Sequence, residues 1–529
     1  MADMNPGINQ QSPPQIVDTS GRPLVSMTGA HRAARFDHDM LSYAPPLRSA
    51  DADLLPDMRT MVSRALDQSR NYPMVSGANQ IHLDNIIGSG LRLSAKPDYR
   101  WLGLDAEWAA EWSRDVELFF RNYVEDPDCW IDASRRLTFG AMLGLAYRQY
   151  LTTGDILAST EWLPRRNAAL STAIQMIDPA RLSNPHGLAD ANKLRGGVEM
   201  DRMGAPIAYH IRSAMEGDNW FYGADTYSWK RVSRETKWGR AKIIHIFEQE
   251  RPGQSRGKSR LASVIAKGYG LEKFHDVSLE ASIINSMYAA VIETEFNFAQ
   301  AAQALDATDL ASAANGVLSS QQAFQKGSQA VQMGGVKIPH LYPGERFNFM
   351  PSNHPGPNFA EFEKAFNRHM AAGQNLPYEM YARDYSETNY SGARAGLQEA
   401  WKFFTSRREL IGGRFATQVY TLVLEEGIDK GHIKLPPGSP DFYQGKAAYT
   451  RCRWIGPGKG QIDPLKESKA DELEMDMGTL TLEEACARRG LDWQENLEQI
   501  AREQAFKEQM GIKRTDEQRG YNAPEAPAA

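Results

Sequence analysis

Apolar side chains recur at helical spacing in four stretches near the start of the chain. A repeat of three or four residues predicts amphipathic helices, each with one buried face. Asn71-Tyr-Pro73 ends the first of them, and Gly88-Ser-Gly90 ends the second, because proline and glycine stop helices at such positions. The predicted helices cover Asp57–Arg70, Val75–Ile87, Leu104–Tyr123 and Leu137–Leu151.

Short strand-like segments follow these helices. Gly154-Asp155 turns the chain into the first of them, and a turn at Gly204 precedes another. The predicted strands are Ile156–Glu161, Gln175–Asp178, Gly197–Met200, Gly204–Ile211 and Ile243–Phe247. The fold class predicted from this mixture is α+β.

A long helical pattern runs from Ser259 to Ala299, although Gly268 and Gly270 are positions where it could bend. A helix of roughly 40 residues would be about 60 Å long, which suits a spoke or a tunnel wall. Residues 306–332 are rich in Ala, Ser and Gln, which predicts weak packing. Val336–Pro339 and Leu341–Phe347 then read as two short strands about a turn.

A polar loop links two further helical patterns. Phe359–Ala372 is the shorter one, and the longer one runs from Ala393 to Ile411 with Lys402, Arg407 and Arg408 between its apolar positions. The loop between them contains Asp384-Tyr-Ser-Glu-Thr-Asn-Tyr-Ser-Gly-Ala-Arg394. Two helices joined by such a loop suit gating or gripping, and no acid, base and nucleophile cluster there.

Both ends of the chain differ from the middle. Met1–Pro46 is rich in Pro, Gly, Ser and Gln, which predicts a flexible arm. Asp463–Gly511 has a helical pattern, and the stretch from Asp463 to Arg519 holds 15 Asp/Glu against 9 Lys/Arg. This acidic end is a poor candidate for gripping DNA. The Ala/Pro-rich Asn522–Ala529 is predicted to be disordered.

Composition bounds the class of protein. The chain has 529 residues, is 42% hydrophobic and 24% charged, and carries a net charge of −6. These values are ordinary for a large soluble protein and argue against one that coats nucleic acid with its whole surface. The cysteines Cys129, Cys452 and Cys486 are far apart, which suits a reducing compartment and gives no metal-ligand spacing. No apolar run is long enough for a membrane span or a signal peptide.

A basic and aromatic stretch has two interpretations. Trp229–Arg260 contains ten Lys/Arg against three Glu, with Trp229 and Trp238 among them. Basic residues interleaved with aromatic ones are typical of nucleic-acid surfaces. The simpler interpretation is a solvated charged face with both tryptophans pointing inward, and it is favoured because aromatic side chains are usually buried.

Two motifs suggest enzymes. Gly253-Gln-Ser-Arg-Gly257 matches a nucleophile elbow with Ser255 as nucleophile, but the following helix is too long for an α/β-hydrolase and the later parallel strands are missing. Gly253–Ser259 also approaches a phosphate-binding loop of a nucleotide-driven motor. It is one residue short between the glycines, and the acidic Val423–Glu426 lies in a helical pattern rather than a strand. We therefore predict no catalytic residue, no metal and no cofactor.

Several stretches together resemble the lambda-type portal protein of tailed bacteriophages. Each match is weak alone, but their order and spacing span some 400 residues. The matching segments are Asp84–Gly90, Ile244–Phe247, Arg251–Gly257, Leu341–Glu345, Asp384–Ser386, Asn389–Arg394, Trp454–Gly458, Ile462–Glu467 and Ala485–Asp492.

The resemblance implies a layout of the subunit. The expected parts are a flexible arm (1–46), an α+β wing (47–258), a first stem helix (259–299), a small α/β clip (300–355), a second stem helix (356–373), the tunnel loop with its long helix and a return to the wing (374–462), a helical crown (463–512) and a disordered tail (513–529). One departure from the family pattern is Gly392 after Ser391, which implies a more mobile loop.

The resemblance also implies a function. Such subunits form a ring, a dodecamer, at one capsid vertex, through which a terminase motor pumps double-stranded DNA. Head-to-tail joining proteins bind later, and the major capsid and scaffolding proteins surround the ring. The implied location is the virion after assembly in the host cytoplasm, without a membrane partner. The implied tunnel-loop residues are Tyr385, Ser386, Glu387, Thr388, Asn389, Tyr390, Ser391 and Arg394, and the implied clip residues for terminase docking are Gly334, Gly335, Lys337 and Glu345.

A conduit must not hold DNA tightly, because each phosphate contact adds salt-dependent affinity. Lys402, Arg407 and Arg408 are candidates for loose contact with the DNA backbone. Alternatively, they pair with Glu399 and Glu409 on the helix surface. Closing a ring also needs a large interface between neighbours, for which the tryptophan-rich wing helices are the expected source.

Overall fold

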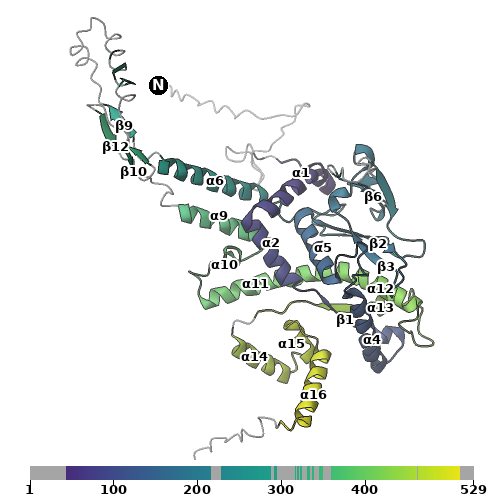
Figure 1. Cartoon of the computed structure of the whole chain (residues 1–529). Coiled ribbons are helices and arrows are strands. Elements are labelled where there is room, and N and C mark those ends of the chain that lie inside the picture. Colours follow the sequence, from purple (N-terminus) through teal and green to yellow (C-terminus); the bar gives the residue numbers. More distant parts are fainter. Residues whose placement is uncertain are drawn as a thin grey trace, which may run out of the picture.

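The computed structural model shows a mixed α+β body from which a pair of helices and a separate helical module extend (Figure 1). The residues that it describes are 43, 45–215, 218, 228–287, 291–294, 316, 319–320, 322–323, 331–333, 336–338, 345–348, 359–460 and 463–512. Most of the predicted arm and clip and all of the predicted tail therefore lie outside the described residues.

The four helices predicted near the start of the chain are confirmed. They are α1 (Ala50–Asn71), α2 (Pro73–Ile86), α4 (Ala106–Val124) and α5 (Phe139–Thr153). The first helix begins seven residues before the predicted Asp57, because the Ser49 side chain caps it by accepting from the Ala52 amide. Gly88 follows α2 with a φ of 59°, a conformation that glycine adopts without strain.

Two antiparallel sheets form the β part of the body. The first has the order β3-β2-β8 and the second the order β4-β5-β6-β7. Asp155 pairs with Phe247 at one end of the β2–β8 ladder, and the predicted strand Ile243–Phe247 is found with the same bounds. The strands are β2 (Asp155–Trp162), β3 (Thr172–Met176), β4 (Leu194–Arg195), β5 (Val198–Met200), β6 (Pro206–Arg212), β7 (Trp229–Ser233) and β8 (Ile243–Phe247).

A long helical run crosses the body. It begins as α11 (Tyr390–Glu409), continues through a π-helical segment (Leu410–Ala416) and ends as α12 (Thr417–Asp429). At 1.5 Å per residue such a run is about 60 Å long. The start of α11 is exposed, whereas every residue from Val419 to Gly427 is buried in the core. One end of this run therefore lies at the surface and the other inside the body.

The main core surrounds α12. Aromatic side chains from α4, α5 and α12 meet there edge to face: Phe120 packs against both Phe139 and Tyr420. The chain then returns through α13 (Lys446–Tyr449) to β13 (Cys452–Ile455), which pairs with β1 (Arg92–Ala95). A second, smaller core containing Leu157, Tyr209 and Ile243 lies between the two sheets.

The paired helices are α6 (Ile265–Met287) and α9 (Phe359–Gly373), which lie side by side (Figure 1). Phe274 of α6 stacks on Phe359 at 5.3 Å between ring centroids. The predicted bounds of the first helix, 259–299, are wrong. Residues 260–264 form turns held to the body, and Val291–Thr294 is strand β9, where a β-branched run favours extended backbone.

Two strand pairs lie beyond these helices. β9 pairs with β12 (Glu345–Asn348), and β10 (Val331–Met333) pairs with β11 (Val336–Ile338). The strand expected at Val336–Pro339 is found one residue shorter, and the one expected at Leu341–Phe347 is found as Glu345–Asn348. They pair with other strands rather than with each other, and local sequence does not show this because the helical pattern extends over β9.

The C-terminal module consists of α14 (Pro464–Asp476), α15 (Leu482–Arg488) and α16 (Trp493–Gln509), as the helical pattern predicts. Neither α14 nor α16 has a buried residue in the described subunit. The module contacts the body through ion pairs, among them Arg92–Glu495 at 3.1 Å and Lys96–Glu483. Its attachment is therefore mostly polar.

Candidate functional site

The predicted loop lies at the surface between a short helix, α10 (Tyr378–Ala382), and α11. Arg383 ends α10 in the left-handed conformation with a φ of 55°. Asn389 caps α11, and its side chain accepts from the Gly392 amide at 2.7 Å. Tyr385 is 57% exposed and Tyr390 is 48% exposed. Two large aromatic side chains of the loop are therefore available to contact another molecule.

Hydrogen bonds give the loop a defined shape. Asp384 accepts from both the amide and the hydroxyl of Ser386, at 3.1 and 2.6 Å, and these bonds lower the pKa of its carboxyl. The Thr388 amide donates to the Tyr385 carbonyl at 3.2 Å, and its hydroxyl donates to Glu379 at 3.3 Å. Arg394 follows, exposed on α11. The predicted loop residues thus lie together on one surface feature.

The three candidate cations of the long helix differ in their surroundings. Lys402 is exposed. Arg407 contacts Glu248 at 2.6 Å and donates to the Tyr150 hydroxyl at 3.0 Å. Arg408 donates to the carbonyl oxygens of Ile86, Asn85 and Pro457 at 3.0–3.2 Å. Burial lowers the pKa of the Arg408 guanidinium.

Arg407 and Arg408 therefore act inside the subunit, and we do not retain them as DNA contacts. The alternative pairing with Glu399 or Glu409 is not seen for either arginine within the described residues. Both expectations treated α11 as a surface helix along its whole length. Tertiary packing instead buries Ala400 and Phe404 of its C-terminal half and turns Arg407 and Arg408 toward the body, while Lys402 stays exposed.

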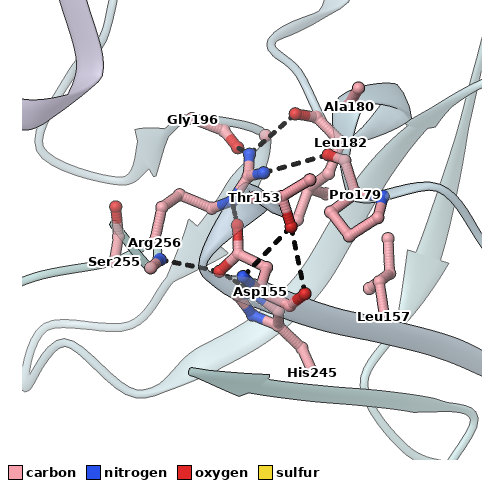
Figure 2. A network of polar contacts seen from close by, with 12 residues as sticks. Thr153, Asp155, Leu157, Pro179, Ala180, Leu182, Gly196, His245, Ser255 and Arg256 are labelled. Carbon is pink, nitrogen blue, oxygen red and sulfur yellow. Dashed lines mark hydrogen bonds and ion pairs between the residues drawn. The ribbon is translucent and has the colours of Figure 1, made fainter. Parts of the chain in front are cut away.

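The elbow-like sequence around Ser255 forms no catalytic site. Ser255 is buried, and its amide donates to Asp51. Its hydroxyl has no hydrogen-bond partner in the part of the chain that the structure describes. His245, the nearest histidine in the sequence before it, directs Nε2 to Asp155 Oδ1 at 3.0 Å (Figure 2). His245 is thus a core histidine paired with Asp155.

Asp155 and Arg256 form the centre of that buried network (Figure 2). Arg256 Nε donates to Asp155 at 2.8 Å, and the Gly257 amide donates to the other carboxylate oxygen at 2.6 Å. These charges and hydrogen bonds hold the pKa of Asp155 below its usual range, although burial alone would raise it. Arg256 also donates to three carbonyl oxygens, those of Pro179, Leu182 and Gly196.

The same contacts bear on the phosphate-binding interpretation. The amides of Ser255 and Gly257 are already bonded to carboxylates of the chain itself. Glu425 and Glu426 lie in α12, as the helical pattern predicts, where Glu425 pairs with Arg240 at 2.9 Å. Glu426 accepts from the amides of Ser171 and Thr172 and pairs with Lys430. None of these groups is arranged to hold a nucleotide phosphate or its metal.

The basic and aromatic stretch has an exposed tryptophan. Trp238 is 63% exposed at the turn before β8, so the inward orientation favoured for both tryptophans is wrong for this one. Trp229 is half-buried, and its indole donates to Ser183 at 3.0 Å. Trp238 lines a cleft of about 1250 Å³ between the two sheets and α12. Cations and carboxylates both line this cleft, which gives it no single sign of charge.

The predicted clip residues are only partly described. Lys337 lies in β11 and Glu345 in β12. Gly334 and Gly335 lie outside the described residues. Within the described ranges there is no group of His, Cys, Asp and Glu side chains able to hold a metal ion. No helix there is both long and apolar enough to cross a bilayer.

Sequence reasoning missed the buried charges that join distant segments. Asp155 holds Arg256 and Glu248 holds Arg407 from distant segments, and Glu426 accepts from the amides of Ser171 and Thr172. Local spacing gives no signal for such pairs, because their partners are far apart along the chain. A charge within an otherwise apolar helical run, as at Glu426, is the one signal that could have pointed to them.

Comparison with known proteins agrees with the resemblance. The profile of the family described as "Phage portal protein, lambda family" matches residues 36–408. The portal protein of Escherichia phage N15 is 33% identical over 94% of both chains. Portal protein B of Escherichia phage lambda is 32% identical, over 90% of this chain and 89% of its own.

More distant matches come from a halophile phage and from solved structures. A probable portal protein of Halomonas phage phiHAP-1 is 23% identical over 92% of this chain and 88% of its own. Among structures, the neck of an empty gene transfer agent particle computed with C6 symmetry is 13% identical with a TM-score of 0.42, covering 81% of this chain and 93% of that one. The native particle's neck, computed with C12 symmetry, is 12% identical with a TM-score of 0.40, covering 85% and 97%.

Portal proteins are structural, non-enzymatic components of the virion, at the vertex where head and tail connect. The buried Ser255 and the occupied amides around it are consistent with that role. Matches over 90–94% of the chain at 32–33% identity are stronger evidence for the family than the short motifs alone. The chain belongs to the lambda family of phage portal proteins.

Proposed function

We propose that this chain is one subunit of a closed ring, a dodecamer, whose channel carries double-stranded DNA during packaging and ejection. The observation that carries the proposal is family membership, which extends from residue 36 to residue 408 and includes the exposed loop. In this proposal the loop residues Tyr385–Ser391 and Arg394 face the channel. The two tyrosines exposed at the start of α11 support that placement.

Exposed apolar side chains support assembly with other copies. Leu497, Phe506 and Met510 of the C-terminal module are exposed in the single subunit. Exposed apolar groups gathered on one module are typical of surfaces that bind another protein. A ring needs the same two surfaces of each copy to meet head to tail, so neighbouring crowns are a natural place for part of that interface.

The charge of the chain suits a conduit that does not hold its cargo. The net charge is −6, and burial removes Arg407 and Arg408 from the surface of α11. Each phosphate contact would strengthen binding and make it depend on salt, so few contacts permit sliding. Lys402 remains as the candidate for a loose contact with the DNA backbone.

The proposed partners follow from the same role. The terminase large subunit would dock on the clip that contains Lys337 and Glu345, and head-to-tail joining proteins would bind after packaging. The major capsid and scaffolding proteins would surround the ring during assembly in the host cytoplasm. The separate placement of β9, β12, β10 and β11 beyond the paired helices gives the clip an accessible position (Figure 1).

A double substitution in the loop tests the proposal. We expect Tyr385→Ala with Tyr390→Ala to leave ring mass unchanged, because both side chains are exposed and support no core. The rate of DNA packaging should fall at least about tenfold if these side chains touch the moving duplex, an increase of about 1.4 kcal/mol in the activation free energy. The measurement is nuclease-protected DNA in assembled heads.

Trp101→Ala provides the control, since Trp101 is also an exposed aromatic residue but lies on the short helix α3 (Tyr99–Leu102) of the body. It should package normally. Wild-type packaging by the loop variant would show that these tyrosines do not contact DNA.

A further inference from the structure

The loop is attached to the second stem helix by an ion pair. Glu387, the loop's exposed carboxylate, contacts Lys364 of α9 across a separation of 23 residues. Glu387 is 72% exposed, whereas Lys364 is 24% exposed. Lys364 is therefore the more enclosed partner, and the Glu387 carboxylate of the loop is the more exposed one.

Neighbouring side chains orient the lysine. Its ammonium lies 5.9 Å from the centroid of the Tyr378 ring, and the Arg368 guanidinium lies 5.5 Å from the same centroid. Cations near an aromatic face are attracted by its quadrupole, so Tyr378 favours the rotamer that points Lys364 at the loop. Lys364 and Arg368 are four residues apart on α9, and thus on one face of that helix.

A cavity separates the loop from the helix on either side of this contact. Its volume is about 820 Å³, and Met74, Glu363, Lys364, Tyr378, Asp384 and Glu387 are among the residues that line it. Because the space between loop and helix is open, apolar packing does not fill it. The ion pair and the Thr388–Glu379 hydrogen bond are the contacts that bridge loop and neighbouring helices there.

We propose that Lys364 is a positioning residue for the tunnel loop and acts by holding Glu387 against the second stem helix. Movement of that helix would then move the loop. The ion pair does not depend on the ring, whereas the idea that a positioned loop faces DNA rests on the proposed function. Exposed pairs of this kind are weak and screened by salt, so the loop is held reversibly.

Hydrogen exchange of the purified full-length protein tests the contact. The Thr388 amide, bonded to the Tyr385 carbonyl, reports whether the loop keeps its shape. Lys364→Glu should speed exchange in a peptide covering residues 384–392 by about two- to fivefold, the range that corresponds to measured exposed ion pairs. The difference from wild type should shrink in high salt.

Swapping the two charges distinguishes a positioning role of Lys364 from a purely structural one. Combining Lys364→Glu with Glu387→Lys should restore wild-type exchange, because the pair is rebuilt with its signs reversed. Lys364→Arg should retain most of the protection. Lys273→Glu, the same charge change at an exposed position of α6, should leave the loop peptide unaffected.

The proposal would be overturned if Lys364→Glu left hydrogen exchange of the loop peptide unchanged. It would also be overturned if the double variant with swapped charges failed to restore protection. Equal melting temperatures of the variants would show that each is folded. Because exchange is read without DNA or heads, this result is independent of the packaging result for the loop tyrosines. Failure here would leave the channel proposal standing, and the converse also holds.

Discussion

Individual side chains of this subunit affect its stability most where their charges are buried. Asp155 and Arg256 are both almost fully enclosed; Arg256 also donates to backbone carbonyls, and Asp155 also bonds the Gly257 amide and the His245 ring. A buried pair contributes little compared with an apolar pair of the same shape, but loss of one partner is costly. This asymmetry predicts which substitutions the α+β body will not tolerate.

Arg256→Ala should destabilise the protein by about 3–5 kcal/mol, because it leaves the Asp155 carboxylate buried without its partner. Arg251→Ala is the matched control, since Arg251 lies in the same loop but pairs with Asp53 in an exposed position. The control should cost less than about 1 kcal/mol. Denaturant unfolding of both variants measures the difference, and equal losses would contradict the assigned role of Arg256.

Glu117 gives a residue-scale prediction for pH. Burial, together with Asp492 and Glu495 nearby, raises its pKa to about 7, although an Ala95 amide donates to it at 2.6 Å. A carboxyl whose pKa is raised in the folded state contributes stability that is fully present at pH values below its unfolded-state pKa. This contribution is lost as the pH rises through the folded-state pKa of about 7. Glu117→Gln should therefore match wild type near pH 5 and be more stable near pH 8, by about 1–3 kcal/mol. Urea unfolding at both pH values measures this, and a variant less stable than wild type at pH 8 would contradict it.

At the scale of elements, the long run from α11 to α12 connects the exposed loop to the core. Its exposed start carries the loop, its middle holds Arg407 and Arg408 in contacts with the body, and its end is anchored by Glu426. The π-helical segment lies where the run enters the core, and Gly412 there packs against Trp454. A shift of the loop end would thus be resisted by buried contacts along the same run.

Helix α6 carries a glycine whose replacement tests how the helix packs. Gly270 lies inside α6, and a Cβ added there would meet no atom within 4 Å. Gly270→Ala should stabilise the helix by about 0.5–1 kcal/mol, because alanine loses less backbone freedom on folding. Gly268→Ala is the control, since its Cβ would approach Gln68 and Met370 to 3.1 Å and offset the gain. Hydrogen exchange of α6 measures both, and equal protection of the two variants would contradict the packing argument.

The whole molecule is expected to be incomplete as a single chain. α14 and α16 bury no residue within the described subunit, and polar contacts hold their module to the body. Such a subunit gains stability from neighbours that cover its apolar groups. The two projecting parts, the paired helices α6 and α9 and the C-terminal module, leave the body from different sides (Figure 1).

Native mass measurement tests assembly. The purified protein should give a particle whose mass is an integer multiple of 59.1 kDa, and micrographs should show rings with a central hole. A charged substitution on the exposed apolar surface, Phe506→Glu, should shift the distribution toward single chains if that surface lies between neighbours. A monomer at all concentrations in the wild type would contradict the ring.

The sequence by itself determined the helices with strong apolar periodicity, the strand Ile243–Phe247 and the loop before α11. These features follow from the local spacing of residues, and the short segments that resemble the family are likewise recognised from the order of residues along the chain. Only tertiary structure decided that Val291–Thr294 is a strand, since it pairs with Glu345–Asn348 far along the chain. It also decided that Arg407 and Arg408 face inward and that Lys364 meets Glu387. The physical reason is that pairing and burial depend on which distant segments the fold brings together, and residue spacing does not record those contacts.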